Sequence, residues 1–97
     1  MAQFDVHRLG AGLVLDCQSD LLAHLNTRVV VPLIHGDTAP APAHRFNPAF
    51  VIGDQNFVMD TQFISSVERR HLGAIVSSLA HRSFEITDAL DILISGV

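Results

Sequence analysis

The sequence predicts a mainly β domain, a small antiparallel barrel or sheet closed by one C-terminal helix. Three observations predict it: period-two strand patterns, two glycine-containing hairpin turns, and a single helical pattern at the end. The 97 residues allow one domain, 1–97, and the 48% hydrophobic content requires a buried core. Because a chain this short buries only about two thirds of its unfolded surface, we expect a homodimer to add stability.

The first half is predicted to start with a β-hairpin. In "AQFDVH", apolar Phe4 and Val6 alternate with polar neighbours, "RLGAG" supplies turn glycines, and "LVLDC" resumes the strand pattern. The β-branched run "RVVVPL" predicts a further strand. Since proline cannot donate to a strand ladder, we expect Pro32 at an edge, a bulge or a strand end.

Between these strands, "QSDLLAHLNT" mixes turn-forming residues with leucines and predicts an irregular connection. Asp16 and Asp20 flank its start, and we interpret them as turn and cap residues. Leu21 and Leu22 have two interpretations, because they either fill the core or lie exposed and bind a partner.

A loop and a second hairpin follow. The loop "IHGDTAPAPAHRFNP" contains Gly36, Pro40, Pro42 and Pro48. In "AFVIGDQNFVMDTQFISSV", two strands are predicted around the turn 53–56, with Phe57 and Met59 on one face. The next segment, "VERRHLGAIVSSLAHR", predicts turns with room for one helical turn, because a glycine and two serines weaken its helical pattern.

The last segment predicts a helix from Ser83, its expected N-cap, to Gly96, with Glu85 and Asp88 near the positive end of the helix dipole. The helical pattern continues into the final residues, and we expect its outward side and tip to bind another macromolecule. At about 100° per residue, the arc expected to face the strands contains Ile86, Ala89, Leu90, Leu93 and Val97. The opposite arc contains Asp88, Asp91 and Ser95, with Ile92 and Ile94 on the flanks.

Charge and composition argue against several classes of function. The net charge is −4 and the chain has no lysine, so it lacks the basic face of a nucleic-acid binder. No signal peptide or membrane-spanning run is present, which predicts a cytoplasmic protein. Cys17 is the one cysteine and lies in an apolar stretch, so we interpret it as a buried, inert thiol.

No motif predicts a catalytic or metal site, and we expect no cofactor. The histidines show no metal-ligand spacing, and the G-x-S-x-G motif of hydrolases is absent. They are His7, His24, His35, His44, His71 and His81. The run His81-Arg82-Ser83 has two interpretations, a ribonuclease-like acid and cation or an anchor at the helix start, and we favour the anchor.

A series of short segments runs in order through almost the whole chain. They are "QF.V", "DCQSDLL", "RVVVPL", "VIGDQNFVMDT", "SSV", "LAHR", "ITDAL" and the final Gly96-Val97. In this order and spacing the chain resembles the CcdB family of toxins from type II toxin–antitoxin systems. The proline-rich loop is the one part that the resemblance does not cover.

The resemblance implies an SH3-like five-stranded antiparallel barrel with a small extra sheet and a C-terminal helix, the fold shared with MazF, assembled as a homodimer. It implies an inhibitor that is not an enzyme: family members bind the A subunit of DNA gyrase, trap its cleaved-DNA complex, and are neutralised by a cognate antitoxin. The gyrase-binding positions that the resemblance implies are Leu21, Leu22, Asp91, Ile94, Ser95, Gly96 and Val97.

The chain departs from the family at its end and leaves two alternatives open. The best-known family pattern ends in Trp-Gly-Ile, whereas this chain ends in Ser95-Gly96-Val97 and contains no tryptophan. One alternative is a MazF-like endoribonuclease toxin, against which the −4 charge argues. The other is a CcdB relative with altered or lost gyrase targeting.

Overall fold

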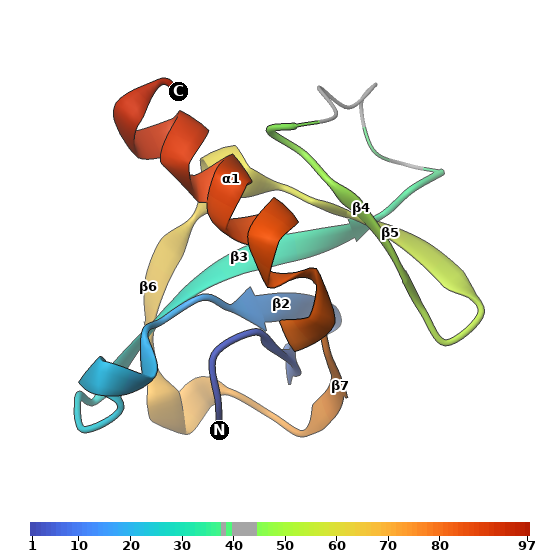
Figure 1. The fold of residues 1–97 in the computed structure, drawn as a ribbon. Coiled ribbons are helices and arrows are strands. Elements are labelled where there is room, and N and C mark those ends of the chain that lie inside the picture. The colour runs from blue at the N-terminus through green and yellow to red at the C-terminus, as the bar shows by residue number, and fades with distance from the viewer. Residues whose placement is uncertain (38, 40–44) are drawn as a thin grey trace.

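The structure, a computed structural model, describes residues 1–37, 39 and 45–97 (Figure 1). Pro40 and Pro42 of the predicted loop lie outside these residues. The strands are β1 (Asp5–Leu9), β2 (Gly12–Asp16), β3 (Thr27–His35), β4 (Ala49–Ile52), β5 (Gln55–Met59), β6 (Ser65–Glu68) and β7 (Ile75–Ser78). The helices are four short 3-10 turns, η1 (Asp20–Leu22), η2 (Thr61–Phe63), η3 (Arg69–His71) and η4 (Ala80–Arg82), and the α-helix α1 (Ser83–Ser95).

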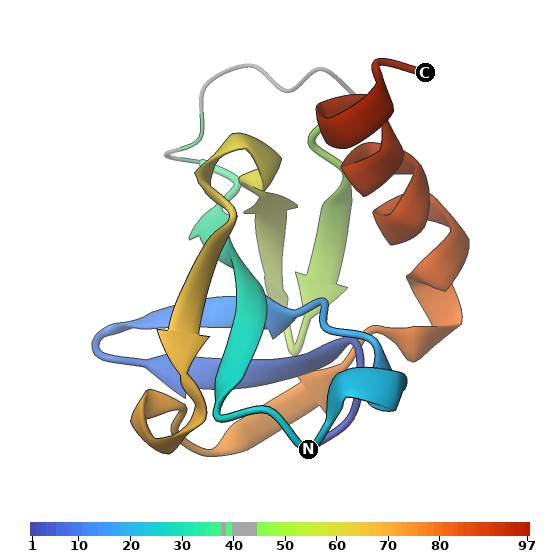
Figure 2. The same cartoon turned by 90° about the vertical axis from the view of Figure 1, so that its left-hand side faces the viewer.

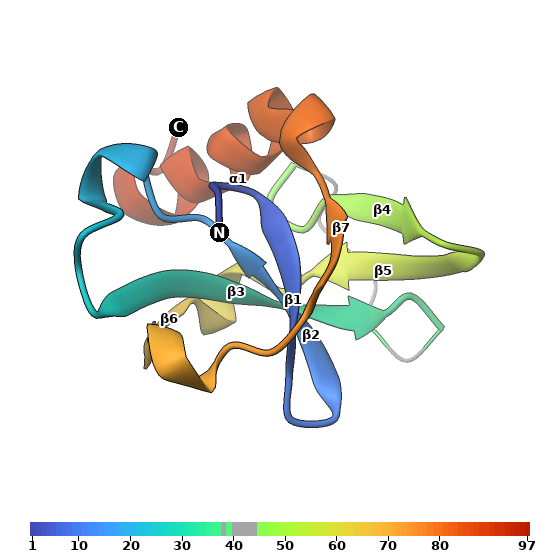
Figure 3. The ribbon, with the colours of Figure 1, turned by 90° about the horizontal axis from the view of Figure 1, so that it is seen from below.

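The predicted mainly β fold with one C-terminal helix is confirmed, and β3 joins its two parts. Residues 27–30 of β3 pair with β6, whereas residues 33–35 pair with β5. The strand path β6-β3-β2-β1-β7 therefore makes a curled five-stranded antiparallel sheet, and β4, β5 and the end of β3 make the small extra sheet. Figures 2 and 3 show the two parts diverging from β3, with α1 along one side of the molecule.

The expectation for Pro32 is wrong, because this residue lies in the interior of β3. At Pro32, β3 pairs with β2 on one side, and on the other side its partner changes from β6 to β5. Neither β6 nor β5 pairs with residues 31 and 32. The Pro32 carbonyl accepts a hydrogen bond from the Asp60 N–H at 2.9 Å on that side. In a strand the N–H and C=O of one residue point to the same side, so the missing N–H falls where no strand needs it.

Both predicted hairpins are confirmed. Residues 10 and 11 connect β1 to β2, and residues 53 and 54 connect β4 to β5, so the second turn is shorter than the predicted 53–56. Gly53 has a φ of +62°, which a side chain would strain, whereas residues 55 and 56 already belong to β5. Phe57 and Met59 are both buried and belong to one apolar cluster, as the alternation predicts.

The segment 67–82 contains more regular structure than its sequence predicts. β6 extends to Glu68, β7 spans Ile75–Ser78, and η3 and η4 are two helical turns instead of one. β7 pairs with β1 through a bulge at Val76, and Gly73 lies so close to the Arg8 carbonyl that a Cβ there would come within 3.0 Å of it. Pairing with β1 thus overrides the weak local pattern.

The core lies between the sheet and α1, which packs through Ile86 and Ala89 (Figure 1). The predicted N-cap is wrong. η4 runs directly into α1, so Arg82 is the N-cap, and Ser83 already has helical φ and ψ values of −57° and −36°. The buried apolar cluster comprises Phe4, Val6, Leu15, Cys17, Val31, Leu33, Phe50, Phe57, Met59, Leu79, Ile86 and Ala89.

Candidate protein-binding surface

η1 holds two leucines away from the core. The side chains of Leu21 and Leu22 are 88% and 45% exposed. The Ser19 hydroxyl accepts a hydrogen bond from the Leu21 N–H at 3.2 Å, and the Asp20 carboxylate accepts one from the Gln3 N–H at 2.9 Å. The turn is therefore fixed by polar contacts of its backbone and of the Asp20 side chain, and the interpretation that these leucines fill the core is wrong.

A buried polar network supports η1 from below. The Arg28 guanidinium donates to the Asp16 carboxylate at 2.6 and 2.9 Å, and both side chains are fully buried. Gln18 continues the network, because its amide donates to the Leu22 carbonyl at 2.9 Å and accepts from the Val29 N–H at 3.1 Å. The prediction of Asp16 as a turn residue is correct but incomplete: its carboxylate accepts a hydrogen bond from the Gln18 N–H at 3.1 Å, two residues on, and is also half of an internal ion pair.

Cys17 lies between these polar residues with its side chain turned to the apolar cluster. Burial, with a smaller contribution from the charge of Asp16, raises the pKa of the thiol to about 12. The thiolate is the reactive form of cysteine, so this thiol is inert near neutral pH, as the sequence predicts.

The last turn of α1 forms a second exposed apolar end. Ile94 and Val97 are each 78% exposed, and Asp91, Ser95 and Gly96 are exposed beside them. Gly96 adopts a left-handed φ of +78°, and its N–H donates to the Ile92 carbonyl at 3.0 Å, which closes the helix.

The predicted inward arc of α1 is correct at its start and wrong at its end. Ile86 and Ala89 are fully buried, and Leu90 packs against the core cluster, whereas Val97 is exposed. The reason is geometric: the left-handed residue Gly96 ends the helix, so the periodicity that would direct Val97 to the strands does not apply to it.

The two exposed ends do not meet within one chain. Figures 1 and 2 show η1 beside the N-terminus and the final turn of α1 at the opposite end of the molecule. The structure therefore brings together Asp91, Ile94, Ser95, Gly96 and Val97, but it leaves Leu21 and Leu22 as a separate apolar surface.

Phe84 is an exposed aromatic residue that the sequence analysis does not single out. Its side chain is 86% exposed in the first turn of α1, where a hollow of about 180 Å³ is bounded by Arg45, Pro48, Glu85 and Asp88. The Arg45 guanidinium donates to the Asp88 carboxylate at 2.8 and 3.1 Å and lowers the pKa of that carboxyl. The sequence contains one signal for its exposure, because Phe84 falls on the same helical arc as the outward-facing Asp88 and Asp91.

The remaining chemistry-bearing candidates are structural or isolated. Arg82 forms an ion pair with Glu85, donates to the Ala49 carbonyl at 3.3 Å and lies 4.8 Å from the Phe50 ring centroid, which confirms its interpretation as an anchor. Within residues 1–37, 39 and 45–97, no group of three or more His, Cys, Asp or Glu side chains could hold a metal ion. His44 lies outside these residues. In the same part of the chain no helix is long and apolar enough to cross a bilayer.

The curled antiparallel sheet with one C-terminal helix confirms the predicted CcdB/MazF-like fold. A solved structure of an endoribonuclease in complex with its cognate antitoxin, from a mycobacterial species, is similar to this chain with a TM-score of 0.78. The similarity covers 97% of this chain and 94% of that one at 19% identity, which establishes the fold alone.

The sequence decides the family within this class. A family model described as CcdB protein matches residues 3–96, almost the whole chain. This protein belongs to the CcdB family. The membership indicates a toxin of a toxin–antitoxin system.

Proposed function

We propose that this protein is a toxin that binds the A subunit of DNA gyrase and traps the enzyme in its complex with cleaved DNA. A cognate antitoxin neutralises it, and the toxin acts by binding and not by catalysis. The observation that carries the proposal is the exposure of the family's contact positions. Leu21 and Leu22 project from η1, and Ile94 and Val97 project from the end of α1.

Exposed apolar side chains of this kind are typical of protein-binding surfaces. Large apolar residues that a fold holds in solvent contribute nothing to the core, so they are available to a partner. The backbone around both ends is fixed, at η1 by Ser19 and Gln18 and at α1 by Gly96. A fixed backbone lowers the entropy lost on binding, which supports a role in recognition.

A homodimer fits this function better than a monomer. One chain presents η1 and the end of α1 far apart, and a two-fold dimer would present two copies of each. Gyrase A is itself a symmetric partner in the proposal, so paired ends would match its two-fold axis. The dimer and its contact residues are part of this proposal.

The decisive experiment is capture of purified gyrase A by the full chain beside a version that ends at Ile94. The full chain is expected to capture gyrase A and to stimulate DNA cleavage by the assembled enzyme. The shortened version is expected to fold, by circular dichroism, and to fail in both assays. Equal capture by the two chains would contradict the proposal, because residues 95–97 would then not contact gyrase.

A substitution at Ser95 provides a second test, in which binding to gyrase A should become tighter instead of being lost. It is exposed at the position where the family pattern has tryptophan, so Ser95→Trp should leave the fold unchanged. A buried tryptophan anchor contributes roughly 2 kcal/mol, or about thirtyfold in affinity. The variant is therefore expected to bind gyrase A more tightly, which calorimetry or surface plasmon resonance would measure. An unchanged affinity would remove this position from the contact surface.

An endoribonuclease is the second candidate, since the similar solved structure is described as one. RNA cleavage in a metal-free buffer would favour it, whereas gyrase-dependent DNA cleavage would favour the first. A third possibility is a toxin that binds its antitoxin but has another target. Antitoxin capture without gyrase capture and without RNA cleavage would identify it.

A further inference from the structure

Gln18 is a buried residue whose side chain connects η1 to the sheet. It is 4% exposed, and its backbone N–H donates to the Asp16 carboxylate at 3.1 Å. The amide nitrogen Nε2 of its side chain donates to the Leu22 carbonyl at 2.9 Å, and the amide oxygen Oε1 accepts from the Val29 N–H at 3.1 Å. A glutamine amide can donate and accept at once, so one side chain binds a residue of η1 and a residue of β3 together.

The oxygen of this amide replaces a missing strand partner. β2 ends at Asp16, and one further ladder bond runs from the Cys17 N–H to the Val29 carbonyl at 2.8 Å. Two residues in such a pair normally exchange both hydrogen bonds, so the Val29 N–H points toward the Cys17 carbonyl. That carbonyl accepts from the side-chain amide of Gln3 at 3.2 Å. Gln18 Oε1 thus completes the ladder at the point where the chain leaves the sheet to form η1.

The nitrogen of the same amide fixes the last residue of η1. The carbonyls at the end of a helix lack partners inside it, and the Leu22 carbonyl accepts from Gln18 Nε2 and from the Leu25 N–H, the latter at 3.1 Å. η1 contains three residues, so a bond at Leu22 also fixes the direction of Leu21. The two exposed leucines are therefore held by an amide that is itself anchored to β3.

We propose that Gln18 is the positioning residue of the η1 surface, the residue that sets the direction in which Leu21 and Leu22 meet a partner. Its burial keeps it from touching the partner, so it acts through the two leucines. The inference rests on the proposed function only for the identity of that partner, gyrase A.

Amide hydrogen exchange of the full chain tests the positioning without a partner. Gln18→Met keeps the length of the side chain and removes both of its hydrogen bonds, and circular dichroism would establish that the variant folds. Exchange is expected to quicken about tenfold in residues 21–25 and to stay unchanged in the last turn of α1. Unchanged exchange in η1, or an equal increase in α1, would overturn the inference.

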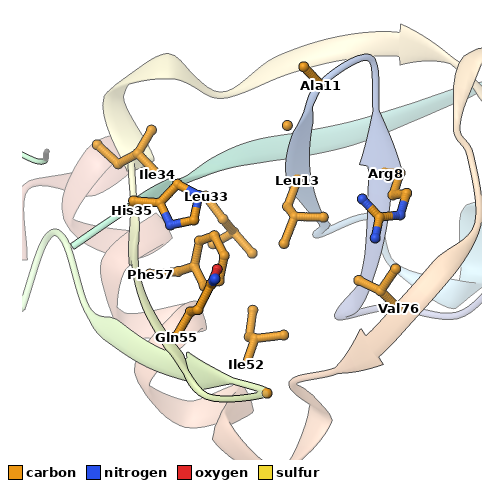
Figure 4. A pocket seen from close by; sticks show the side chains of 12 residues that line it. Arg8, Ala11, Leu13, Leu33, Ile34, His35, Ile52, Gln55, Phe57 and Val76 are labelled. Carbon is orange, nitrogen blue, oxygen red and sulfur yellow. The ribbon is translucent and has the colours of Figure 1, made fainter. Parts of the chain in front are cut away.

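Gln55→Met is the matched control, because it makes the same chemical change outside this network. Gln55 lines a groove of about 530 Å³ together with Arg8 and the apolar side chains of Leu13, Leu33 and Ile52 (Figure 4). No residue that lines this groove belongs to η1. The control is expected to leave exchange in η1 and gyrase A binding unchanged. An effect as large as that of the Gln18 variant would overturn the inference, because loss of a glutamine amide anywhere in the fold would then suffice.

A double-mutant cycle separates positioning from a general weakening of the fold. In the otherwise unaltered chain, Gln18→Met is expected to weaken gyrase A binding about tenfold. In a chain that already carries Leu21→Ala and Leu22→Ala, the same change should have no further effect on binding, although urea denaturation should show the same loss of stability. Equal effects on binding in the two backgrounds would overturn the inference, since a purely structural role does not depend on the leucines.

Exchange and capture together distinguish this inference from the proposed function. If the unaltered chain fails to capture gyrase A while Gln18→Met quickens exchange in η1 alone, the proposed target is contradicted and the positioning role is supported. Capture by the unaltered chain with unchanged exchange in the η1 of the variant would do the reverse.

Discussion

The two exposed apolar ends of this protein are held in solvent by different means. η1 is a single turn whose position depends on the buried pair Asp16–Arg28 and on Gln18, residues that lie inside the sheet. The end of α1 is an extension of a regular helix, and its shape depends on its own backbone and on Gly96. Changes inside the barrel should therefore move the leucines of η1, whereas only local changes should move Ile94 and Val97.

This difference bears on how each surface could evolve. The last turn of α1 makes few demands on the core, so its side chains are free to change with a partner. The η1 surface is coupled to the stability of the domain, since the network that positions it is fully buried. Four changes to the protein or its solvent test this contrast, in order of decreasing effect on stability.

Arg28→Met should have the largest effect. It leaves the Asp16 carboxylate buried without its partner, which costs about 3–5 kcal/mol, a large part of the stability of a small domain. Urea denaturation would measure the loss. In the matched control, Asp16→Leu combined with Arg28→Met, roughly half or more of the loss should return, because no buried charge remains. No recovery in the double variant would mean that packing, and not charge, explains the loss.

Alkaline pH should destabilise the folded chain through Cys17, which lies among the polar residues that support η1. Burial raises the pKa of this thiol from 9.0 to about 12, so above pH 9 the unfolded chain loses a proton that the folded chain keeps. Stability therefore falls as pH rises, by about 2 kcal/mol at pH 10.5. The chain has no lysine and no tyrosine, so few other groups titrate in this range. Urea denaturation at pH 8 and pH 10.5 would measure it, and Cys17→Ala should remove most of the slope.

Gly96→Ala should loosen the end of α1 and leave η1 unchanged. Space is not the obstacle, since nothing lies within 4 Å of an added Cβ, but the φ of +78° strains a side chain by about 1 kcal/mol. Amide hydrogen exchange should quicken in the last turn of α1 with η1 unaffected. Gly96→Asn should lose less, because asparagine tolerates this conformation. Faster exchange in η1 as well would contradict the independence of the two ends.

Leu21→Ala and Ile94→Ala should have the smallest effect on stability. Both side chains are largely exposed, so each change should stay within about 0.5 kcal/mol in urea denaturation. Leu15→Ala, inside the core, is the contrasting control and should cost about 2–5 kcal/mol. The two surface variants should nevertheless weaken gyrase A capture. A large loss of stability in either would show that its side chain is part of the fold.

Local patterns were sufficient for the regular elements and insufficient where distant residues meet. The hairpins with turns at residues 10–11 and 53–54, and the inward position of Ile86 and Ala89 on α1, follow from periodicity and turn residues. β7 was missed because its serines and bulge acquire order from β1, a strand far away in sequence. The ion pair of Asp16 was missed for the same reason, since its partner Arg28 lies across a turn that the pattern leaves irregular.

Residue order and short-range periodicity were enough to predict the family, the mainly β class and the helix that ends at Gly96. The folded chain was needed to show that Pro32 lies inside a strand, that Asp16 and Arg28 form a buried pair, that Leu21 and Leu22 lie apart from the end of α1, and that Arg8 faces an apolar groove. The physical reason is that burial and charge pairing are properties of residues brought together by the fold. A local pattern identifies strands that are joined by a short turn, but it does not specify which strands distant in sequence become neighbours.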